Sequence, residues 1–300
     1  MTAFATAGSA TERRLRALCT VLCLAAITCI ALFIRLLNSR QVFTGDGIHF
    51  MESDCFYHMR RVFLAFQNRW HIPEFDSYMN YPQGFHCNWP PLFDHLIAGA
   101  AWLTGLGNPS DRWIEATGAM ISPLLGACST VALYALARRF LSVVPALSSA
   151  ALLAFLPFHI QLSVLGRPDH HMAVVLVAVL LLWSASGIPD RPSKIHVRIC
   201  IQTGILLALL FLLWTGSLLF AGILALWFCA LGLLRLRDPA LPSWLLQAAL
   251  VFISGALALL PFVMQTHWTR AGELGWDAPS LLQPLVLFIA GAFFLIARFA

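Results

Sequence analysis

Long apolar runs separated by short polar segments limit what this chain can fold into. Of its 300 residues, 59% are hydrophobic and only 11% are charged. An ordinary soluble domain carries about 25% charged residues, so this chain has too few charges to cover a surface that faces water. A run of about 20 apolar residues crosses a hydrocarbon core about 30 Å thick. The sequence therefore predicts an all-α, polytopic transmembrane protein.

The distribution of charge argues against a nucleic-acid-binding protein. The formal net charge is +5, but the basic residues stand in short groups between the apolar runs. The sequence has no basic stripe interleaved with aromatic residues, which is the pattern typical of a nucleic-acid surface. We therefore expect membrane lipid, and no nucleic acid, among the partners.

The cysteines form no metal-binding or redox motif. None of the eight belongs to a CxxC pair, and most lie within or beside apolar runs, where cysteine behaves as a small hydrophobe. Cys55 and Cys87 differ, because they stand in a polar stretch. A disulfide between them on an oxidising face and a pair of free thiols both fit the sequence.

The apolar runs predict eight spans. The first covers about residues 17–36 and follows the basic segment 13–16, so we expect an uncleaved span with its N-terminus in the cytoplasm. The others are expected at about 115–137, 143–163, 172–187, 199–215, 218–234, 244–264 and from residue 281 onward.

The run 92–106 decides the orientation of the later spans. It is too short to cross the membrane and contains Asp94 and His95. If it did cross, Arg138 and Arg139 would lie outside. If it lies flat on the outer surface, both arginines lie in the cytoplasm, as the positive-inside bias favours. We take the second arrangement, which also makes the other inner loops basic and leaves every polar cluster outside.

This arrangement predicts a single transmembrane domain over residues 1–300, with outer loops at 37–93 and 265–280. The segment 56–70 is expected to form a helix along the membrane surface, because its apolar residues recur at helical spacing: Phe56, Met59, Val62, Phe63 and Phe66. No soluble C-terminal domain follows the last apolar run. We therefore expect a fragment, or the membrane part of a longer protein.

Ionisable side chains beside lipid are functional candidates, because their placement there is costly. Asp169 and His171 stand where a span begins on the outer face, and both can reach one metal ion if the backbone there is not helical. The alternative is that Asp169 accepts backbone hydrogen bonds as a helix N-cap. Arg167 either pairs with Asp169 or holds a phosphate, since its planar fork suits both.

The outer loops contain further candidates. Taken by itself, each of Asp54 and His86 in the first outer loop would be an ordinary loop residue. The late loop adds Glu273 as a third carboxylate and Arg270 as a phosphate clamp, unless it is a plain hydrophilic connector. If the spans bring these groups to one face, they supply carboxylates and imidazoles for a single metal site. Such a donor set suits Mn²⁺ better than Ca²⁺.

The order and spacing of these motifs resemble the GT-C fold of lipid-dependent glycosyltransferases. The resemblance is to the catalytic subunits of oligosaccharyltransferases, of the archaeal and bacterial single-subunit type, and it covers most of the chain. It rests on the segments 54–60 (DCFYHMR), 76–84 (DSYMNYPQG), 89–92 (WPPL), 166–171 (GRPDHH) and 214–216 (WTG).

That resemblance implies a metal-dependent glycosyltransferase in the bacterial inner (cytoplasmic) membrane. It would transfer a glycan from a polyprenyl-diphosphate donor to asparagine of an acceptor protein or peptide on the outer face, with Mn²⁺ or Mg²⁺ as cofactor. The implied roles are metal ligands at Asp54, His86, Asp169 and His171, catalytic acids at Asp54, Asp169 and Glu273, and lipid-phosphate contacts at Arg167 and Arg270.

Two features depart from that family. The late outer loop is short, which bears on Glu273, and the Trp-Trp-Asp-Tyr-Gly motif that reads the acceptor sequon is missing. Two other functions therefore stay open. One is a GT-C transferase that uses a polyprenyl-monophosphate sugar for a lipid or glycan acceptor. The other is a non-catalytic protein, either a truncated homologue or a lipid-binding or transporter-like chain. Against a transporter, the spans themselves are nearly free of charge.

Overall fold

The computed structural model describes residues 10–188 and 195–299, which fold almost entirely into helices. The longer helices are α1 (Ala10–Arg35), α5 (Asp111–Ala137), α6 (Val143–Phe155), α8 (His171–Ala185), α9 (Val197–Leu213), α10 (Leu218–Leu233), α11 (Leu241–Val263) and α13 (Leu282–Ala297). The smaller elements are α2 (Ser39–Val42), α3 (Ser53–Gln67), α4 (Leu92–Thr104), α7 (Pro157–Gln161), the 3₁₀ turn η1 (Thr215–Ser217), α12 (His267–Arg270) and the paired strands β1 (Phe75–Asp76) and β2 (Phe85–His86).

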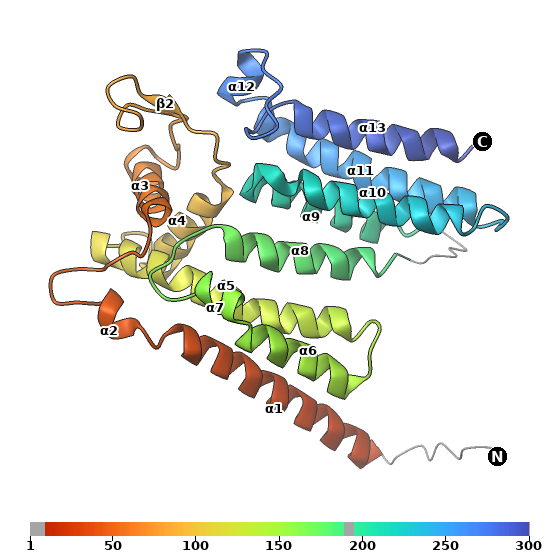
Figure 1. The fold of residues 1–300 in the computed structure, drawn as a ribbon, viewed down its shortest axis with the longest axis horizontal. Helices are drawn as coiled ribbons and strands as arrows, with labels where there is room; N and C mark the ends of the chain where they lie inside the picture. Colours follow the sequence, from red (N-terminus) through yellow and green to blue (C-terminus); the bar gives the residue numbers. More distant parts are fainter. Residues whose placement is uncertain (1–9, 189–194, 300) are drawn as a thin grey trace.

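The longer helices run side by side, and their connections gather at two ends of the bundle (Figure 1). The outer end, named after the predicted orientation, carries α2, α3, α4, the β1–β2 hairpin and α12. The inner end carries the α5–α6 and α10–α11 connections, and both described ends of the chain point the same way. Arg138 and Arg139 follow α5 and Arg235 follows α10, so the described basic connections lie opposite the polar clusters, as the positive-inside bias requires.

The helices pack in a continuous series. α1, α5 and α6 contact one another, α5 contacts α8, and from there the contacts run through α9 and α11 to α13. An aromatic cluster fills the far side of this series, where Phe228 of α10 packs against Trp244 and Phe252 of α11 and Phe294 of α13. Because the interior is apolar and the helix backbones satisfy their own hydrogen bonds, this arrangement is stable within lipid.

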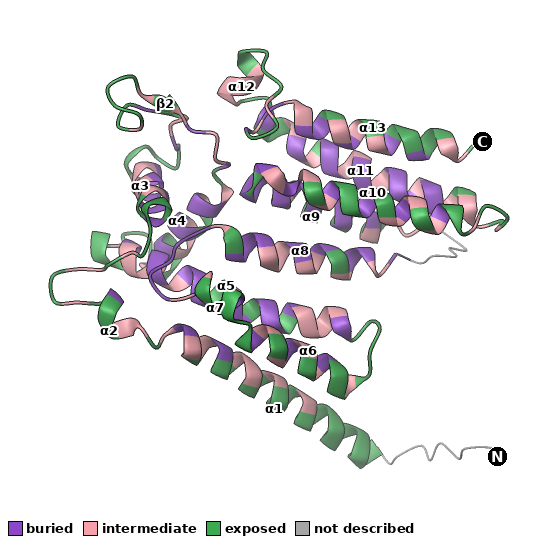
Figure 2. Cartoon of the chain, viewed as in Figure 1, coloured by how far each residue is buried: buried purple, intermediate pink, exposed green. Residues whose placement is uncertain are grey.

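The outer surfaces of the helices are apolar too, which identifies a multi-pass integral membrane protein. Four described helical segments are long and apolar enough to cross a membrane: Ala10–Val42, Asp111–Ala137, Thr215–Leu233 and Leu241–Val263. In the apolar 18-residue stretch of the first segment, only 6% of the residues are buried in the protein. Helix α1 is exposed along most of its length (Figure 2). Each of the eight predicted spans falls on an apolar helix, but four of those helices are shorter, so the number that cross stays a prediction.

Helices α9 and α11 approach closely at a pair of glycines. A Cβ atom on Gly204 would lie 2.5 Å from the carbonyl oxygen of Val251 and 2.8 Å from the backbone nitrogen of Gly255. Small residues at such contacts let membrane helices pack backbone against backbone. The sequence positions of these glycines thus fix how near the two helices lie.

Gly204→Ala is expected to lower the stability of the chain by about 1–3 kcal/mol, because the added methyl collides with backbone that cannot move aside. The matched control is Gly222→Ala in α10, where a Cβ meets nothing within 4 Å; alanine there is expected to be neutral or slightly stabilising. Thermal unfolding of both variants in detergent is the measurement. Equal melting temperatures for the two would contradict the close approach.

The structure has a helix in each of the two predicted surface segments and corrects one detail. Helix α3 lies where the surface helix was predicted, and the run 92–106 forms α4 at the outer end, packed against α3 and α5. The buried face of α3, however, is formed by Cys55, His58, Met59, Arg61, Val62 and Ala65. Phe56, predicted on the apolar face, is 56% exposed. The buried face is rotated away from Phe56. Cys55 and His58 lie one helical turn before Met59 and Val62, so these four residues share a face and Phe56 does not.

Candidate metal centre

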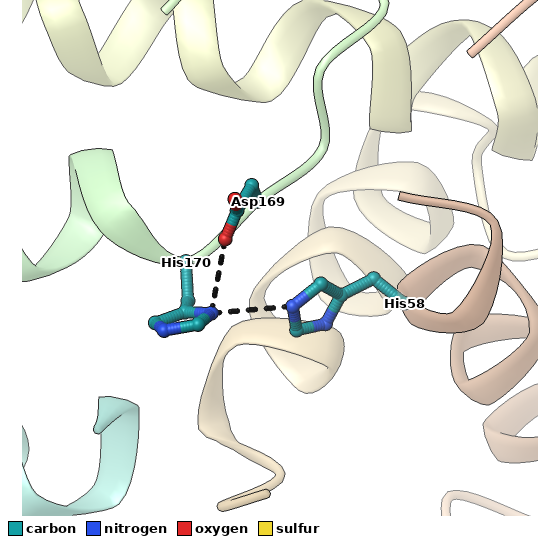
Figure 3. Close-up of side chains that lie close together, drawn as sticks. All are labelled: His58, Asp169 and His170. Atoms are coloured by element: carbon teal, nitrogen blue, oxygen red, sulfur yellow. Dashed lines mark hydrogen bonds and ion pairs between the residues drawn. The ribbon is translucent and has the colours of Figure 1, made fainter. Parts of the chain in front are cut away.

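One carboxylate and two imidazoles come together at the outer end of the bundle. They belong to His58, Asp169 and His170, whose ligand atoms all lie within 4.8 Å of one another. His170 Nδ1 lies 3.0 Å from Asp169 Oδ1 and 3.3 Å from His58 Nε2, so His170 stands between the other two (Figure 3). The cluster joins α3 to the loop that precedes α8.

Backbone hydrogen bonds from three directions hold the loop that carries Asp169. The Leu165 N–H donates to the carbonyl of Arg35 at the end of α1, and the Gly166 N–H donates to that of Ala119 in α5. The Met51 N–H, from the first outer loop, donates to the carbonyl of Gly166. The loop is therefore fixed to α1, to α5 and to the start of α3.

Gly166 is the residue that allows this loop to pass so close to its neighbours. Its φ of +81° lies in the left-handed region, which favours glycine. A Cβ atom there would lie 2.8 Å from a methyl group of Val42 and 2.9 Å from the carbonyl oxygen of His49. The backbone angle and the close packing therefore explain why the Gly-Arg-Pro-Asp-His-His motif begins with glycine, whatever chemistry its other residues perform.

A buried carboxylate behind His58 fixes the orientation of that ring. The His58 Nδ1–H donates to Asp94 Oδ1 at 2.6 Å, and the other carboxylate oxygen of Asp94 lies 3.2 Å from Arg61 Nε. Asp94 is fully buried and His58 is 1% exposed. Because Nδ1 carries the proton toward Asp94, the lone pair of Nε2 points into the cluster, toward His170 Nδ1.

The carboxylate of Asp169 is ionised and incompletely paired. Burial alone would raise its pKa, but the interaction with His170 and the charges of His170, His171 and His58 outweigh burial and hold the pKa down at about 2. Asp169 is only 3% exposed, and its Oδ1 has no aligned hydrogen-bond donor despite its closeness to His170. A buried anionic oxygen without a donor is a favourable place for a cation.

The donor set fits a divalent transition metal better than magnesium. Two imidazole nitrogens and one carboxylate oxygen are ligands that Zn²⁺ and Mn²⁺ accept, whereas Mg²⁺ prefers oxygen ligands and water. The Asp94 carboxylate behind His58 is the kind of outer partner that ligating histidines carry. The three candidate ligands and the carboxylate behind His58 therefore both match a metal centre.

Asp54 and His171 lie beside this cluster. Asp54 is exposed in the first turn of α3, where it accepts a hydrogen bond from the Ser53 hydroxyl. His171 begins α8, with Nε2 3.5 Å from Asp169 Oδ2 and a side chain that is 47% exposed. Burial, the largest influence, lowers the pKa of the His171 imidazole, and the charge of Asp54 acts in the opposite direction. Helix α8 has no side-chain cap, and the N-cap alternative for Asp169 is therefore wrong.

Arg167 pairs with Glu52, not with Asp169. Its Nη2 donates to Glu52 Oε2 at 2.7 Å, and Nη1 donates to the carbonyl of Gln161 at 3.3 Å. Arg167 is 8% exposed and its Nε has no partner. The ion pair ties the loop of Asp169 to the residue that precedes α3, so it aligns the two halves of the cluster.

His86 lies in strand β2 and packs against the late outer loop. Its ring stacks on that of His267 with centroids 3.6 Å apart and planes 8° from parallel. His86 Nδ1 is buried and has no hydrogen-bond partner. In the part of the chain that the structure describes, the metal-ligand grouping contains His58, Asp169 and His170 and does not include His86. The fold therefore does not bring His86 into the cluster.

The two candidates of the late loop lie in different surroundings. Glu273 is exposed, and among the described residues its carboxylate makes no hydrogen bond or ion pair. Arg270 lines a cavity of about 360 Å³ at the outer end, together with Arg61, His95 and three tryptophans, Trp70, Trp89 and Trp268. Its guanidinium also donates to the carbonyl of Gln265. Arg270 is thus placed beside a partly open space that two arginines and one acid, Glu74, line.

Cys55 and Cys87 are buried free thiols, so of the two possibilities left open by the sequence the structure has the unpaired one. Burial raises the pKa of the Cys55 thiol to about 11, and the charges of Asp169 and Glu52 act in the same direction.

Cys55 is therefore expected to resist alkylation in the folded chain. At pH 8 a thiol with this pKa is ionised to roughly 0.1%, against about a quarter for an ordinary cysteine, and burial slows the reaction further. Peptide mapping by mass spectrometry after brief maleimide treatment measures it, with the chain unfolded in detergent and urea as control. Labelling that is as fast in the folded as in the unfolded chain would contradict the assignment.

Sequence reasoning missed three members of the site: His58, His170 and Asp94. His58 falls within the predicted surface helix, and its spacing from Cys55 and Val62 places it on the buried face of α3. A histidine on an otherwise apolar helix face was the available indication. Asp94 offered none, because only the packing of α4 on α3 shows that its carboxylate faces His58 and Arg61.

Comparison with known proteins identifies the family. The model of the N-terminal part of oligosaccharyl transferase STT3 matches residues 18–269, which is most of the chain. The chain belongs to this family. Among curated proteins, dolichyl-phosphooligosaccharide-protein glycotransferase 2 of Archaeoglobus fulgidus is 31% identical over 201 residues, covering 66% of this chain and 31% of the relative. Glycotransferase 1 of the same organism is also 31% identical, over 67% of this chain.

Solved structures of the STT3 family share the fold. The A. fulgidus oligosaccharyltransferase in complex with zinc and sulfate superposes with a TM-score of 0.81 and 23% identity, covering 92% of this chain and 35% of that one. The A. fulgidus AglB structure with an inhibitory peptide and a dolichol-phosphate gives a TM-score of 0.80 over 92% of this chain. The GT-C fold predicted from the sequence is thus confirmed. The present chain spans about a third of the length of these curated and solved relatives.

Proposed function

We propose that this chain carries the catalytic membrane part of an oligosaccharyltransferase. It would transfer a glycan from a polyprenyl-diphosphate donor to asparagine of an acceptor protein or peptide. The proposal rests on one observation at the outer end. The side chains of Asp169 and His170 lie beside that of His58 in α3, and His171 lies next to Asp169. This carboxylate–imidazole centre lies in a chain of the STT3 family.

A divalent ion held at Asp169 would neutralise charge on the leaving diphosphate. An imidazole ligand beside carboxylate ligands favours Mn²⁺ or Zn²⁺ over Mg²⁺. Support comes from the A. fulgidus relative, whose structure was solved in complex with zinc and sulfate. Of the two cofactors expected from the sequence, Mn²⁺ and Mg²⁺, we therefore propose that Mn²⁺ binds more tightly.

Two ligand sets share Asp169. The family resemblance gives Asp54, His86, Asp169 and His171, while the geometry gives His58, Asp169 and His170. Asp54 and His171 are exposed, whereas the second set is largely buried. We propose that the ion binds at the solvent-facing side of Asp169 with Asp54 and His171, and that His58 and His170 hold the carboxylate from behind. His86 and Glu273 are proposed to approach only with the late loop.

The donor lipid is proposed to lie along the cavity that Arg270 lines. This cavity adjoins a second one of about 340 Å³, because Pro91, His95, Leu212 and Phe262 line both. The second cavity is bordered by α4, α9 and α11 and is otherwise apolar. A cationic space that continues into an apolar one suits a phosphate with a hydrocarbon tail. The relative solved with a dolichol-phosphate supports this class of ligand.

We place the reaction on the outer face of the cytoplasmic membrane. The described basic connections lie at the opposite end of the bundle, which supports an outward-facing site. A bacterial membrane was expected from the sequence, whereas the curated relatives come from archaea. The orientation holds for either source, because the charge bias does not depend on it.

The test is a transfer assay with the purified chain, a fluorescent Asn-x-Thr peptide and a polyprenyl-diphosphate glycan. We expect transfer that stops on chelation with EDTA and returns with Mn²⁺. A Gln-x-Thr peptide is the matched control for the acceptor. Transfer that continues after chelation would overturn the metal-dependent proposal.

A second donor class is supported by one relative. The Haloferax volcanii protein that is 28% identical over 178 residues is named a dolichyl-monophosphooligosaccharide–protein glycotransferase. The same assay with a polyprenyl-monophosphate glycan separates the two donors. Faster transfer from the monophosphate would replace the diphosphate in the proposal and leave the protein acceptor unchanged.

A further inference from the structure

Two cavities meet at the inner end of the bundle, far from the candidate metal centre. The larger, of about 850 Å³, is bordered by α5, α8 and α10, and the smaller, of about 550 Å³, by α8 and the start of α9. Arg139 and Gly187 line both, so the two spaces adjoin at the side chain of Arg139. Arg235 also lines the larger cavity and Arg198 the smaller one.

The larger cavity is an apolar groove between membrane helices. Its walls are mostly aliphatic and aromatic, with Leu133, Leu136, Phe140, Leu182, Ile223 and Leu231 among them. Several of these side chains are exposed at the surface of the bundle, such as Ile223 at 44% and Leu182 at 39%. The groove is therefore open to the lipid phase along its length, and an acyl chain can enter it from the side.

The smaller cavity is cationic. It is lined by Arg139 and Arg198 and by His196, while none of its described lining residues is acidic. The guanidinium of Arg139 lies 5.0 Å above the ring of Trp183, in a cation–π contact. Such a contact holds a cation in place without neutralising it. Among the described residues, the positive charge of Arg139 meets no carboxylate, and it faces the groove.

We propose that this site binds one anionic phospholipid of the inner leaflet. The phosphate lies between Arg139 and Arg198, and an acyl chain occupies the groove along α5, α8 and α10. Basic pockets between membrane helices on the cytoplasmic side are the expected receptors for anionic lipid headgroups. A soluble phosphate would use only the cationic cavity, whereas the adjoining apolar groove requires a ligand with a hydrocarbon tail.

Lipid binding to the detergent-purified chain tests the proposal directly. Native mass spectrometry counts bound lipid while phosphatidylglycerol or phosphatidylcholine is titrated, and thermal unfolding reports the linked stabilisation. We expect one phosphatidylglycerol to bind and to raise the melting temperature. Phosphatidylcholine is expected to do neither at the same concentration. Millimolar inorganic phosphate is expected to have no effect, because it cannot fill the groove.

The variant Arg139→Gln is expected to weaken phosphatidylglycerol binding about fivefold or more, given the contribution of one basic residue near a lipid headgroup. Arg138→Gln is the matched control, because Arg138 is the adjacent arginine, is exposed, bonds to the carbonyl of Leu141 and lines neither cavity. Ile223→Trp, which narrows the groove from its exposed edge, is expected to reduce lipid binding while leaving the charge unchanged.

Three results would overturn the proposal. Equal binding of phosphatidylglycerol and phosphatidylcholine would show that no headgroup is recognised. Equal losses in Arg139→Gln and Arg138→Gln would show that only the general positive charge of the inner end matters. Stabilisation by inorganic phosphate alone would replace the lipid with a soluble anion. None of these outcomes depends on glycan transfer.

Discussion

Asp169→Asn is expected to abolish Mn²⁺ binding and to reduce glycan transfer roughly 1,000-fold or more. The substitution keeps the size of the side chain but removes the charge on which both proposed ligand sets depend. A metal ion contributes several kcal/mol to transition-state stabilisation, and each 1.36 kcal/mol is about tenfold in rate. Isothermal titration with Mn²⁺ and the transfer assay measure the two effects.

Asp46→Asn is the matched control for this substitution. Asp46 is an acid of the first outer loop, outside the cluster, with a side chain that is 78% exposed and pairs with His49. It is expected to bind Mn²⁺ like the parent chain. Unchanged metal binding in Asp169→Asn would remove Asp169 from the metal site and leave it as a structural group of the loop before α8.

Two further variants decide between the ligand sets. His171→Gln is expected to weaken Mn²⁺ binding strongly, because the proposed ion lies on the solvent-facing side of Asp169, where His171 is 47% exposed. His58→Gln is expected to have the smaller effect, since His58 supports the carboxylate cluster from behind. If His58→Gln proves the more damaging of the two, the ion lies in the buried cluster of His58, Asp169 and His170.

Asp94→Ala is expected to have the largest effect on folding. Asp94 is fully buried between His58 and Arg61, and Arg61 is itself only 4% exposed. Removal of the carboxylate leaves the Arg61 charge buried without an acid. Breaking a buried ion pair from one side costs about 3–5 kcal/mol. We expect a poor yield of folded chain and a large drop in melting temperature.

The double variant Arg61→Met/Asp94→Ala shows whether the buried charge is the cause. It removes both charges and replaces the arginine stem with an apolar side chain, so we expect it to recover much of the stability lost in Asp94→Ala. A double variant that unfolds as readily as the single one would assign the loss to packing in α4 and not to the uncompensated guanidinium.

Asp94→Asn separates folding from metal binding. It keeps an oxygen acceptor for the His58 Nδ1–H and nearly the same volume, so the stability cost is expected to be smaller. Because His58 is proposed to hold the Asp169 carboxylate from behind and not to bind the ion, loss of the negative charge behind His58 is expected to weaken Mn²⁺ binding less than His171→Gln does. Mn²⁺ titration of Asp94→Asn measures it. A folded variant with unchanged affinity would show that His58 does not act on the metal.

The sequence by itself determined the kind of protein and most of its helices. Apolar runs of membrane length fix the helices, because a backbone in lipid must satisfy its own hydrogen bonds. The positions of Arg138, Arg139 and Arg235 then separate the two ends of the bundle. The order of the polar motifs was specific enough to indicate the family that the comparison confirmed. All of this depends on composition and local spacing.

Only the tertiary structure decided which side chains meet. His58 and His170 are 112 residues apart in the chain, and no local pattern states that α3 turns His58 toward the loop before α8. The sequence also left Arg167 between two partners, and packing gave it a third, Glu52. A helical period fixes which residues share one face of one helix. Contacts between the faces of different helices depend on how the helices pack. That packing brought His58 to Asp169 and His170 and left His86 outside the cluster.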